Sequence, residues 1–471
     1  MKTIDKIYIN GEFVTPHGTE EFDLINPTTN ELIGRVILGD EEDTRLAIAA
    51  ATKAFPLFSK TTKEQRIAYL EQMRNAVRKR SAELTDIMVK EYGGTRRFCE
   101  MSTQNCLDAI QAVIDALCDF DFIKTAGKTE VHLQPVGVTA IITPWNASNS
   151  FICNKLATAI AAGCTAVIKP SEMSASQTAV LLESLHEAGL PVGVFNIVNG
   201  RGDVVGETLT SHPAIAKISF TGSTAVGKMI ARNAVDTMKR VTLELGGKSP
   251  NILLDDVDLA KAIPLALTAA FMNSGQACVA GTRLLVPDNK IDEVKSLLSS
   301  SIAHIKVGDP DATDTAVGPL VSRKQYERVQ EYIRIGQQEG AELLVGGEGH
   351  PEGLEKGNFV KPTVFVNVSN KMRIAREEIF GPVLSVITYK TEEEAIAIAN
   401  DTDYGLQAYV SSADKERAHR VANQITAGRV LVNGLFHDPQ APFGGFKQSG
   451  IGREYGVYGL EAYLEPKAIL Q

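Results

Sequence analysis

Hydrophobic and polar positions follow two alternating patterns through the first half of the chain. Between positions 135 and 245, short runs of Val, Ile and Ala alternate with longer segments whose apolar residues recur at helical spacing. Continuously apolar strands separated by helices are typical of a parallel sheet that is covered on both faces. The predicted strands are 136–142, 166–169, 195–198, 217–220 and 240–245, and the predicted helices are 149–162, 174–188, 203–211 and 224–235.

The regions on either side of this core are richer in helices. The N-terminal part begins with two short strands and continues with amphipathic helices, and the second half of the chain resumes the alternation with longer helices. A second α/β unit is therefore expected after the first. The predicted strands are 6–9, 12–14, 282–286 and 359–366, and the predicted helices are 41–55, 62–91, 259–274, 291–305 and 323–339.

Two strand-like segments fit neither unit. Residues 120–133 lie outside the alternation of strands and helices, and residues 462–470 form a short β-like tail. We interpret both as arms that pair outside the core, with another subunit as one possible partner. Ordinary edge strands explain them nearly as well.

Composition and charge narrow the class of protein. The chain of 471 residues carries 48 Lys and Arg against 57 Asp and Glu, a net charge of −9, which argues against broad binding to nucleic acid. No run of 18 apolar residues and no signal-peptide core occur, so we expect no membrane segment. The six cysteines show no C-x-x-C spacing, which predicts no metal site and suits a reducing cytoplasm.

A glycine-rich loop lies between a predicted strand and a predicted helix at residues 220–229. Glycines allow close backbone approach, and the free N–H groups of a helix start attract anions. A phosphate-transfer loop needs Ser or Thr after its lysine, but Met229 stands there and cannot bind Mg²⁺. The dinucleotide template is incomplete as well, because it retains only Gly222 and Gly227. By itself the loop fits a phosphate-bearing ligand and a tight turn about equally.

A candidate nucleophile, Cys278, stands in a loop of small residues that would leave its sulfur accessible. A free thiol has a pKa near 8.5, so it needs activation at neutral pH. No histidine lies in a recognisable protease context, which disfavours a cysteine hydrolase. Glu244 and Asn146 each follow a predicted strand, and the carboxyl ends of parallel strands border a ligand crevice. Each of them taken singly also fits an ordinary turn residue.

Seven motifs occur in order along the chain: PWN (144–146), KPSE (169–172), FTGS (220–223), LELGGK (243–248), GQxC (275–278), EEIFGP (377–382) and PFGGFKxSG (442–450). Together they resemble the NAD(P)-dependent aldehyde dehydrogenase superfamily, from about residue 6 to the C-terminus. The resemblance implies an α/β fold with a Rossmann-like parallel-sheet cofactor domain, a second α/β catalytic domain and a small β arm for bridging and oligomerisation. The expected ranges are 1–116 and 136–245 for the cofactor domain, 246–440 for the catalytic domain, and 117–135 and 441–471 for the bridging segments.

The resemblance also implies an oxidation of an aldehyde to its acid. Cys278 would attack the aldehyde, and the Asn146 amide with the Cys278 N–H would hold the oxyanion. Glu244 would activate water to hydrolyse the resulting thioester. The alternatives are release of the thioester to coenzyme A, which the presence of Glu244 disfavours, and a non-catalytic structural relative, which would be expected to lack one of these three residues. The family arms predict a homodimer or homotetramer.

Cofactor contacts carry over from the same motifs. The resemblance implies that Lys169 and Glu172 bind the adenosine ribose, and that Gly222, Ser223 and Gly227 border the pyrophosphate. We expect NAD rather than NADP, because a carboxylate at 172 would repel the 2′-phosphate by a few kcal/mol at about 4 Å. Lys169 leaves NADP possible. The remaining contacts would be Glu378 on the nicotinamide ribose, with Phe380 and Trp145 nearby.

The sequence departs from the family pattern near the substrate. Ala147 follows the tryptophan–asparagine pair where an aromatic residue is common, and His437 precedes Pro442 by five positions. With Asn154 on the next helix, these residues predict a wider and more polar mouth than a long alkyl aldehyde needs. The alternative is that Met272 or Phe436 fills the space beside Ala147.

Overall fold

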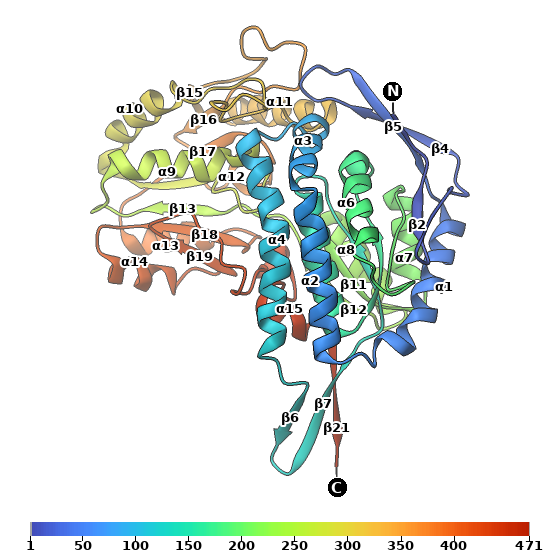
Figure 1. Cartoon of the computed structure of the whole chain (residues 1–471). Helices are drawn as coiled ribbons and strands as arrows, with labels where there is room; N and C mark the ends of the chain where they lie inside the picture. Colours follow the sequence, from blue (N-terminus) through green and yellow to red (C-terminus); the bar gives the residue numbers. More distant parts are fainter. Residues whose placement is uncertain (1, 471) are drawn as a thin grey trace.

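Two large sheets covered by helices occupy the two halves of the molecule, and a small three-stranded sheet projects from it (Figure 1). The computed structural model describes residues 2–470. The fold class predicted from the sequence, α/β with a Rossmann-like sheet, is confirmed.

The first large sheet has eight strands in the order β20-β12-β11-β8-β9-β10-β2-β3. Its five central strands are parallel, and the edge strands β20, β2 and β3 run antiparallel to their neighbours. All residues of β8 and β9 are buried, as their unbroken apolar runs predict. The strands are β2 (Ile7–Ile9), β3 (Glu12–Val14), β8 (Val138–Ile142), β9 (Thr165–Lys169), β10 (Phe195–Ile197), β11 (Ile215–Thr221), β12 (Arg240–Glu244) and β20 (Gly450–Ile451).

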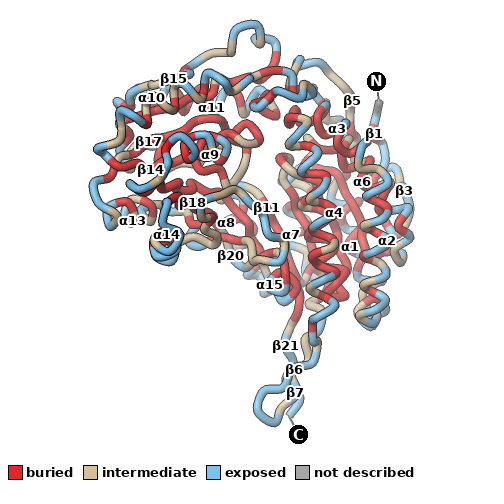
Figure 2. Tube along the Cα trace, turned by 60° about the vertical axis from the view of Figure 1, so that its left-hand side comes forward, coloured by how far each residue is buried: buried red, intermediate tan, exposed pale blue. Residues whose placement is uncertain are grey.

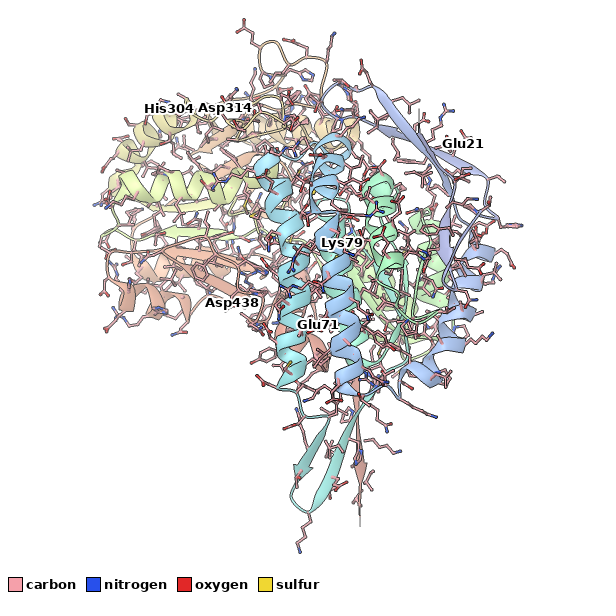
Figure 3. All side chains as sticks on the ribbon, in the orientation of Figure 1. Glu21, Glu71, Lys79, His304, Asp314 and Asp438 are labelled. Atoms are coloured by element: carbon pink, nitrogen blue, oxygen red, sulfur yellow. The ribbon has the colours of Figure 1, made fainter. Side chains whose placement is uncertain are left out.

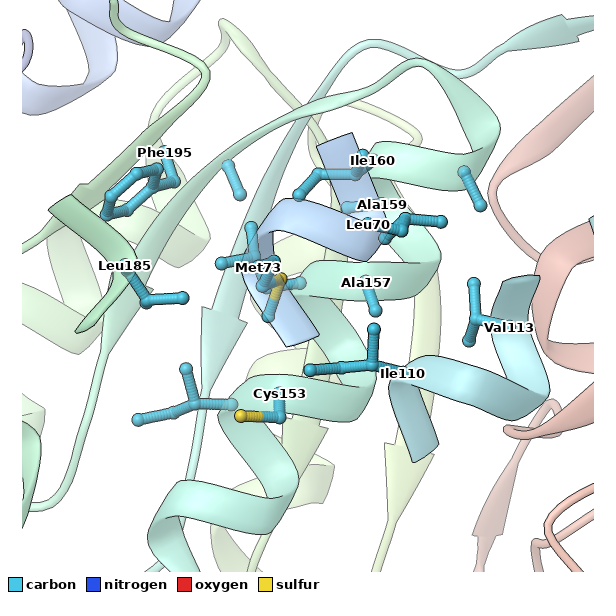
Figure 4. Close-up of a cluster of buried hydrophobic side chains, with 14 of the residues drawn as sticks. Leu70, Met73, Ile110, Val113, Cys153, Ala157, Ala159, Ile160, Leu185 and Phe195 are labelled. Carbon is cyan, nitrogen blue, oxygen red and sulfur yellow. The ribbon is translucent and has the colours of Figure 1, made fainter. Parts of the chain in front are cut away.

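Helices cover both faces of this sheet. On one face a core of apolar side chains joins α2, α4, α5 and α6, with Met73, Ile110, Cys153 and Leu185 among them (Figure 4). Sheet and helices therefore share one continuous core on that side. The helices are α1 (Glu41–Phe58), α2 (Lys63–Lys79), α3 (Ser81–Tyr92), α4 (Arg96–Cys118), α5 (Ser148–Ala162), α6 (Ala175–Glu187), α7 (Glu207–Ser211) and α8 (Thr224–Val235).

Segment 62–91, predicted as one helix, forms two. The backbone at Arg80 leaves the helical region, with φ −108° and ψ 15°. Its guanidinium bonds to the carboxylates of Glu183 and Glu187 on or at the end of α6, at 2.7 and 2.6 Å. Apolar spacing continues through the break, so the pattern alone hides it. The 23-residue helix α4 was not among the predicted elements.

The second large sheet has seven strands in the order β15-β16-β17-β14-β13-β18-β19, and all but β15 are parallel. Segment 359–366 was predicted as a strand, but only its end, β16, is one. The strands are β13 (Pro250–Leu253), β14 (Arg283–Pro287), β15 (Glu342–Val345), β16 (Thr363–Val366), β17 (Val383–Tyr389), β18 (Gln407–Ser411) and β19 (Arg429–Val432). The helices are α9 (Leu259–Phe271), α10 (Ile291–Ile302), α11 (Arg323–Gln338), α12 (Arg373–Arg376), α13 (Glu392–Asn400) and α14 (Lys415–Ala422). Helix α15 (Gly456–Glu461) instead packs against α4 and α5 of the first unit.

The two segments that fitted neither unit pair with each other. Strand β21 (Leu464–Ile469) runs antiparallel to β7 (Thr129–Pro135), which forms a hairpin with β6 (Ile123–Ala126). This small sheet stands away from the body and is largely exposed (Figure 2). A further sheet holds β1 (Lys2–Ile4), β4 (Glu20–Ile25) and β5 (Leu32–Leu38).

The domain ranges stay a prediction, with one difference to note. Segment 441–471 contributes β20 to the first large sheet as well as β21 to the projecting sheet. Among the described residues, no helix is long and apolar enough to cross a membrane.

Candidate active site

A cavity of about 560 Å³ opens at the carboxyl ends of β8, β11 and β12. Eight residues singled out in the sequence line it, and they come from five separate segments. The cavity therefore brings together the turn after each of these strands, the cysteine loop and segment 377–380. The eight residues are Trp145, Asn146, Gly222, Ser223, Glu244, Cys278, Glu378 and Phe380.

The loop that carries Cys278 has an unusual backbone. Helix α9 was expected to reach Ser274 but ends at Phe271, and Asn273 and Ser274 adopt left-handed φ values of 57° and 56°. Such values cost a non-glycine residue about 1–3 kcal/mol, so surrounding contacts must enforce them. Gly275 follows at φ 71°, where a Cβ would lie 2.2 Å from the carbonyl oxygen of Gly381.

Side-chain hydrogen bonds hold this loop in place. Tyr92 Oη donates to Asn273 Oδ1 at 2.8 Å and accepts from Gln276 Nε2 at 3.1 Å. The Val321 N–H donates to Gln276 Oε1 at 3.0 Å. Helix α3, which ends in Tyr92, therefore fixes the position of the cysteine from outside the cavity.

Asn146 reaches the same loop from the end of β8. Its Nδ2 donates to the Gln276 carbonyl at 3.0 Å, and Asn273 Nδ2 donates to the same oxygen at 3.0 Å. The amide of Asn146 is thereby oriented with one N–H on the loop and one N–H left for a ligand. This geometry suits a hydrogen-bond donor placed beside the sulfur of Cys278.

The thiol of Cys278 is a weak acid in this environment. Burial raises its pKa to about 12, and the negative charges of Glu378 and Glu244 raise it further, whereas the N–H groups of Cys278 and Val279 lower it. The thiol is thus protonated at neutral pH, and its reaction needs a base. Small neighbours leave the sulfur at the cavity wall, as the loop composition predicts.

Glu244 is the carboxylate that can serve as that base. It is 2% exposed at the end of β12, and neither side-chain oxygen has a hydrogen-bond partner among the described residues. Burial raises its pKa well above the ordinary value, and the charge of Glu454 adds to the effect, while Lys155 and Arg453 oppose it. A carboxylate with a raised pKa is a stronger base than an ordinary one, which is what removal of a proton from a thiol or from water requires.

A buried ion pair behind Glu244 escaped the sequence analysis. Lys155 on α5 pairs with Glu454 and donates to Ser219 Oγ at 2.9 Å. Asn154, expected near the substrate, instead donates to Glu454 Oε2 at 3.4 Å and does not line the cavity. The sequence did contain one indication of this buried pair, because Lys155 is the single charged residue in the otherwise uncharged predicted helix 149–162.

The glycine-rich turn between β11 and α8 forms another wall. Ser223 caps the helix by accepting from the Val226 N–H at 3.4 Å, and Thr224 and Ala225 also line the cavity. Gly222 lines it too, whereas a Cβ on Gly227 would lie 2.4 Å from Leu245 Cδ2. Gly227 therefore serves the packing of α8 on the segment after β12.

Glu378 and Phe380 lie across the cavity from this turn. Glu378 Oε1 accepts from the Gly247 N–H at 3.1 Å, and burial raises its pKa to about 7. Phe380, at a left-handed φ of 63°, meets Trp145 edge-on with ring centroids 5.4 Å apart. A buried carboxyl and two aromatic rings thus face the same space.

Seven predicted site residues do not line this cavity. Lys169 and Glu172 form an ion pair of 3.3 Å at the end of β9, and burial lowers the pKa of Lys169. His437 is exposed on a loop, where its ring meets that of Tyr455 edge-on at 5.1 Å. The seven are Lys169, Glu172, Gly227, Ala147, Asn154, Met272 and His437, and the lining residues that were missed include Phe151, Gln325, Arg328, Tyr332 and Tyr404.

Comparisons with known proteins agree with this geometry. Residues 13–469 match the model of the aldehyde dehydrogenase family. The 3-succinoylsemialdehyde-pyridine dehydrogenase of a Pseudomonas species is 46% identical over 472 residues, which cover 100% of this chain and 99% of that protein. A cysteine-to-alanine variant of aldehyde dehydrogenase C from Pseudomonas syringae, solved with NAD⁺ and octanal, superposes with a TM-score of 0.97, 45% identity, and coverage of 99% and 96%. An NADP-dependent enzyme of E. coli superposes with a TM-score of 0.94 and 36% identity, and the match covers 99% of this chain and 98% of that enzyme.

Proposed function

Because this chain belongs to the aldehyde dehydrogenase family, we propose that it oxidises an aldehyde to the carboxylic acid through a thioester on Cys278. The observation that carries this proposal is the meeting of Cys278, Glu244 and Asn146 in one cavity beside the glycine-rich turn.

The first step joins the thiol to the aldehyde. Glu244 takes the proton from Cys278, and the sulfur forms a bond with the carbonyl carbon. The free N–H of the Asn146 amide and the N–H of Cys278 stabilise the negative oxygen, and each such donor contributes about 3–4 kcal/mol in comparable sites. Without these donors the charge would build up in a buried and poorly solvated space.

The second step needs an acceptor for the hydride on the carbon attached to sulfur, and NAD⁺ held in this cavity would supply that chemistry. Residues of this chain hold the acceptor. The turn from Ser223 to Ala225 offers N–H groups and the positive end of α8 to a pyrophosphate, whereas the Gly222 N–H donates to the Glu244 carbonyl at 3.0 Å. Glu378 offers a carboxyl to ribose hydroxyls, and Trp145 and Phe380 pack around the nicotinamide side.

The third step releases the acid. Glu244 first gives the proton that it took from Cys278 to solvent. It then removes a proton from water, the water oxygen attacks the thioester carbon, and the carbon–sulfur bond breaks. The sulfur leaves as a thiolate and takes the proton from Glu244, so the site returns to a thiol beside a carboxylate, the state from which the first step starts.

We further propose that NAD is preferred to NADP. Glu172 lies at the end of β9 with its carboxylate 3.3 Å from Lys169 and 4.0 Å from Arg201. Both cations are occupied by carboxylates, since Arg201 also binds Glu20 at 2.7 Å. A 2′-phosphate would meet Glu172 first, and a higher kcat/KM with NADP than with NAD would contradict this assignment.

The decisive experiment measures NADH formation with a panel of aldehydes, without coenzyme A, and identifies the product. We expect free acid and NADH in equal amounts. The variant Cys278→Ala should lose activity completely, whereas Cys118→Ala, at an exposed cysteine outside the cavity, serves as the matched control. Undiminished activity of Cys278→Ala, or NADH formation only when coenzyme A is added and with acyl-coenzyme A as the product, would overturn the proposal.

We also propose that the protein forms a homodimer or homotetramer in the cytoplasm. Strands β21 and β6 are the edges of the projecting sheet. Unpaired edge strands offer N–H and C=O groups to a second chain.

A further inference from the structure

A half-buried arginine stands beside the catalytic loop without an acidic partner. Arg429 begins β19 and lies next to Gln407 of β18. Its guanidinium packs over the ring of Phe443, 5.3 Å from the centroid. Its remaining contacts are weak, with hydrogen bonds of 3.4 Å to His437 Nδ1 and 3.4 Å to the Phe436 carbonyl.

Some partly buried arginines of this chain are paired with carboxylates, whereas Arg453, which also packs over a phenylalanine ring, donates instead to the carbonyls of Gly445 and Gly452 at 3.1 and 2.7 Å. Arg80 binds three carboxylates, and Arg417 binds Asp255 and Glu392 at 2.6 and 2.7 Å. In the part of the chain that the structure describes, Arg429 forms no ion pair. A guanidinium removed from water normally has an anion or several strong acceptors, so this one has donors to spare.

The nearest carboxylate does not fill that role. Asp438 lies on the same loop as His437, between the second large sheet and α4 (Figure 3). Its Oδ1 accepts from the Gln440 N–H at 2.9 Å. Burial lowers the pKa of Arg429, and Asp438 is the only carboxylate near enough to offset the effect. Arg429 remains charged at neutral pH.

The contacts of Tyr409 and Phe443 place Arg429 close to the reacting groups. Tyr409, two positions from Gln407 and therefore on the same face of β18, donates to the Val279 carbonyl at 2.8 Å, next to Cys278. Phe443, under the guanidinium, precedes Gly444, where a Cβ would lie 2.7 Å from Glu244 Oε1. None of Arg429, His437 and Phe443 lines the 560 Å³ cavity that holds the glycine-rich turn. Arg429 therefore approaches Cys278 from a different side.

We propose that Arg429 binds the far end of the substrate and selects aldehydes that carry a carboxylate there. This inference rests on the proposed function. A guanidinium matches a carboxylate in shape and can donate two parallel hydrogen bonds to it. The aldehyde group then points to Cys278 while the acid group replaces the weak contacts to His437 and the Phe436 carbonyl. The polar mouth expected from the sequence thus gains a specific ligand class, the oxo acids.

The test compares four aldehydes with the purified enzyme and NAD. The probes are 4-oxobutanoate, its neutral methyl ester, butanal, and betaine aldehyde, which carries a cation instead. We expect kcat/KM for the acid to exceed that for its ester by at least about tenfold, mainly through KM. Arg429→Gln should reduce the acid-to-ester ratio by about tenfold or more, and Arg429→Lys should restore part of it. A longer series of oxo acids reports the chain length that spans the distance to Cys278.

A matched control and a second measurement keep the result interpretable. Arg420→Gln removes an exposed arginine from α14 and should leave the acid-to-ester ratio as it is. Succinate should inhibit competitively against 4-oxobutanoate more strongly than the neutral diamide succinamide does, and Arg429→Gln should remove the difference. An unchanged ratio in Arg429→Gln, or a preference for the ester or for betaine aldehyde, overturns the inference. Oxidation of none of the aldehydes would instead overturn the proposed function.

Discussion

The carboxylate form of Glu244 and the thiolate form of Cys278 are both poorly solvated, because both groups are buried. Burial favours the neutral form of each, so a proton must move before either group reacts. Placing the two in one cavity solves this, because the proton that leaves one group finds the other. The asparagine amide then meets the charge that develops on the substrate oxygen.

This arrangement predicts how Glu244→Gln behaves. The glutamine is of similar size but cannot accept a proton, so the thioester should form and then persist. We expect steady-state kcat to fall by roughly a hundredfold or more, while a burst of NADH of about one equivalent per site remains at high pH. Rapid-mixing absorbance and intact-protein mass measure both effects. Loss of the burst together with kcat would show that Glu244 is needed mainly for the thiol.

A second buried carboxyl predicts a pH dependence of stability. Burial raises the pKa of Glu91 from 4.5 to about 7, although the N–H groups of Ser176 and Gln177 donate to it at 2.7 and 3.0 Å. The folded state therefore holds this proton more tightly than the unfolded chain does. Its contribution to stability is fully present below about pH 4.5 and is lost as pH rises through 7.

The variant Glu91→Gln should remove this contribution to the pH dependence. Between pH 5 and 8 the free energy of unfolding of the parent chain should fall by up to about 3 kcal/mol more than that of the variant. Urea unfolding at several pH values measures it, with the exposed Glu71→Gln on α2 as the control. Parallel curves for the parent chain and Glu91→Gln would contradict the assignment.

At the scale of elements, the loop after α9 decides whether the nucleophile is placed correctly. Its left-handed residues are held by α3 and by the segment around Gly381. Gly275→Ala should lower the free energy of unfolding by more than about 3 kcal/mol and abolish activity, because its Cβ would meet backbone at 2.2 Å.

The variant Gly340→Ala separates the effect of backbone strain from the effect of a steric clash. This glycine follows α11 at φ 88°, with nothing within 4 Å of a Cβ. The substitution should cost about 1 kcal/mol and leave the kinetics alone. Thermal unfolding and NADH assays on both variants make the comparison. Equal effects at the two positions would mean that the contact with Gly381 is unimportant.

The sequence predicted elements best where periodicity and burial agree. Strands β8 and β9 are mostly apolar and buried throughout, and their parallel pairing followed from that pattern. The break at Arg80 and the end of α9 at Phe271 did not follow, since both depend on contacts with distant elements. The same reason hid the pair of Lys155 and Glu454, whose members are 299 positions apart.

Candidate site residues divide in the same way. Those on motifs at strand ends, such as Asn146 and Glu244, were found and do line the cavity. Asn154 and His437 were assigned from their place in the sequence, and side-chain direction within a helix or a long loop decides where such residues point. Nothing in the sequence singled out Arg429, because arginines are common at the start of strands. Only the structure shows that no carboxylate among the described residues pairs with it.

At the scale of the whole molecule, the projecting sheet predicts the assembly. Its strands β7 and β21 are mostly partly buried or exposed in the single chain, and it stands clear of the body (Figure 1). Removing residues 464–471 should expose β7 and dissociate the proposed dimer or tetramer to a smaller species. Light scattering after size-exclusion chromatography measures this. A monomeric parent protein, or an unchanged mass after truncation, would contradict the role given to the sheet.

Pairing of β21 with β7 joins positions 464 and 135, a separation of 464 − 135 = 329 residues. The ribosome synthesises β21 last, so this strand becomes available only when the chain is nearly complete. The same holds for Glu454, the partner of Lys155, and for Gly444, which lies beside Glu244. The nascent chain thus carries its nucleophile long before the surroundings of its base are complete. A truncated translation product would hold Lys155 without its carboxylate, and the cell would be left with a chain unable to turn over substrate.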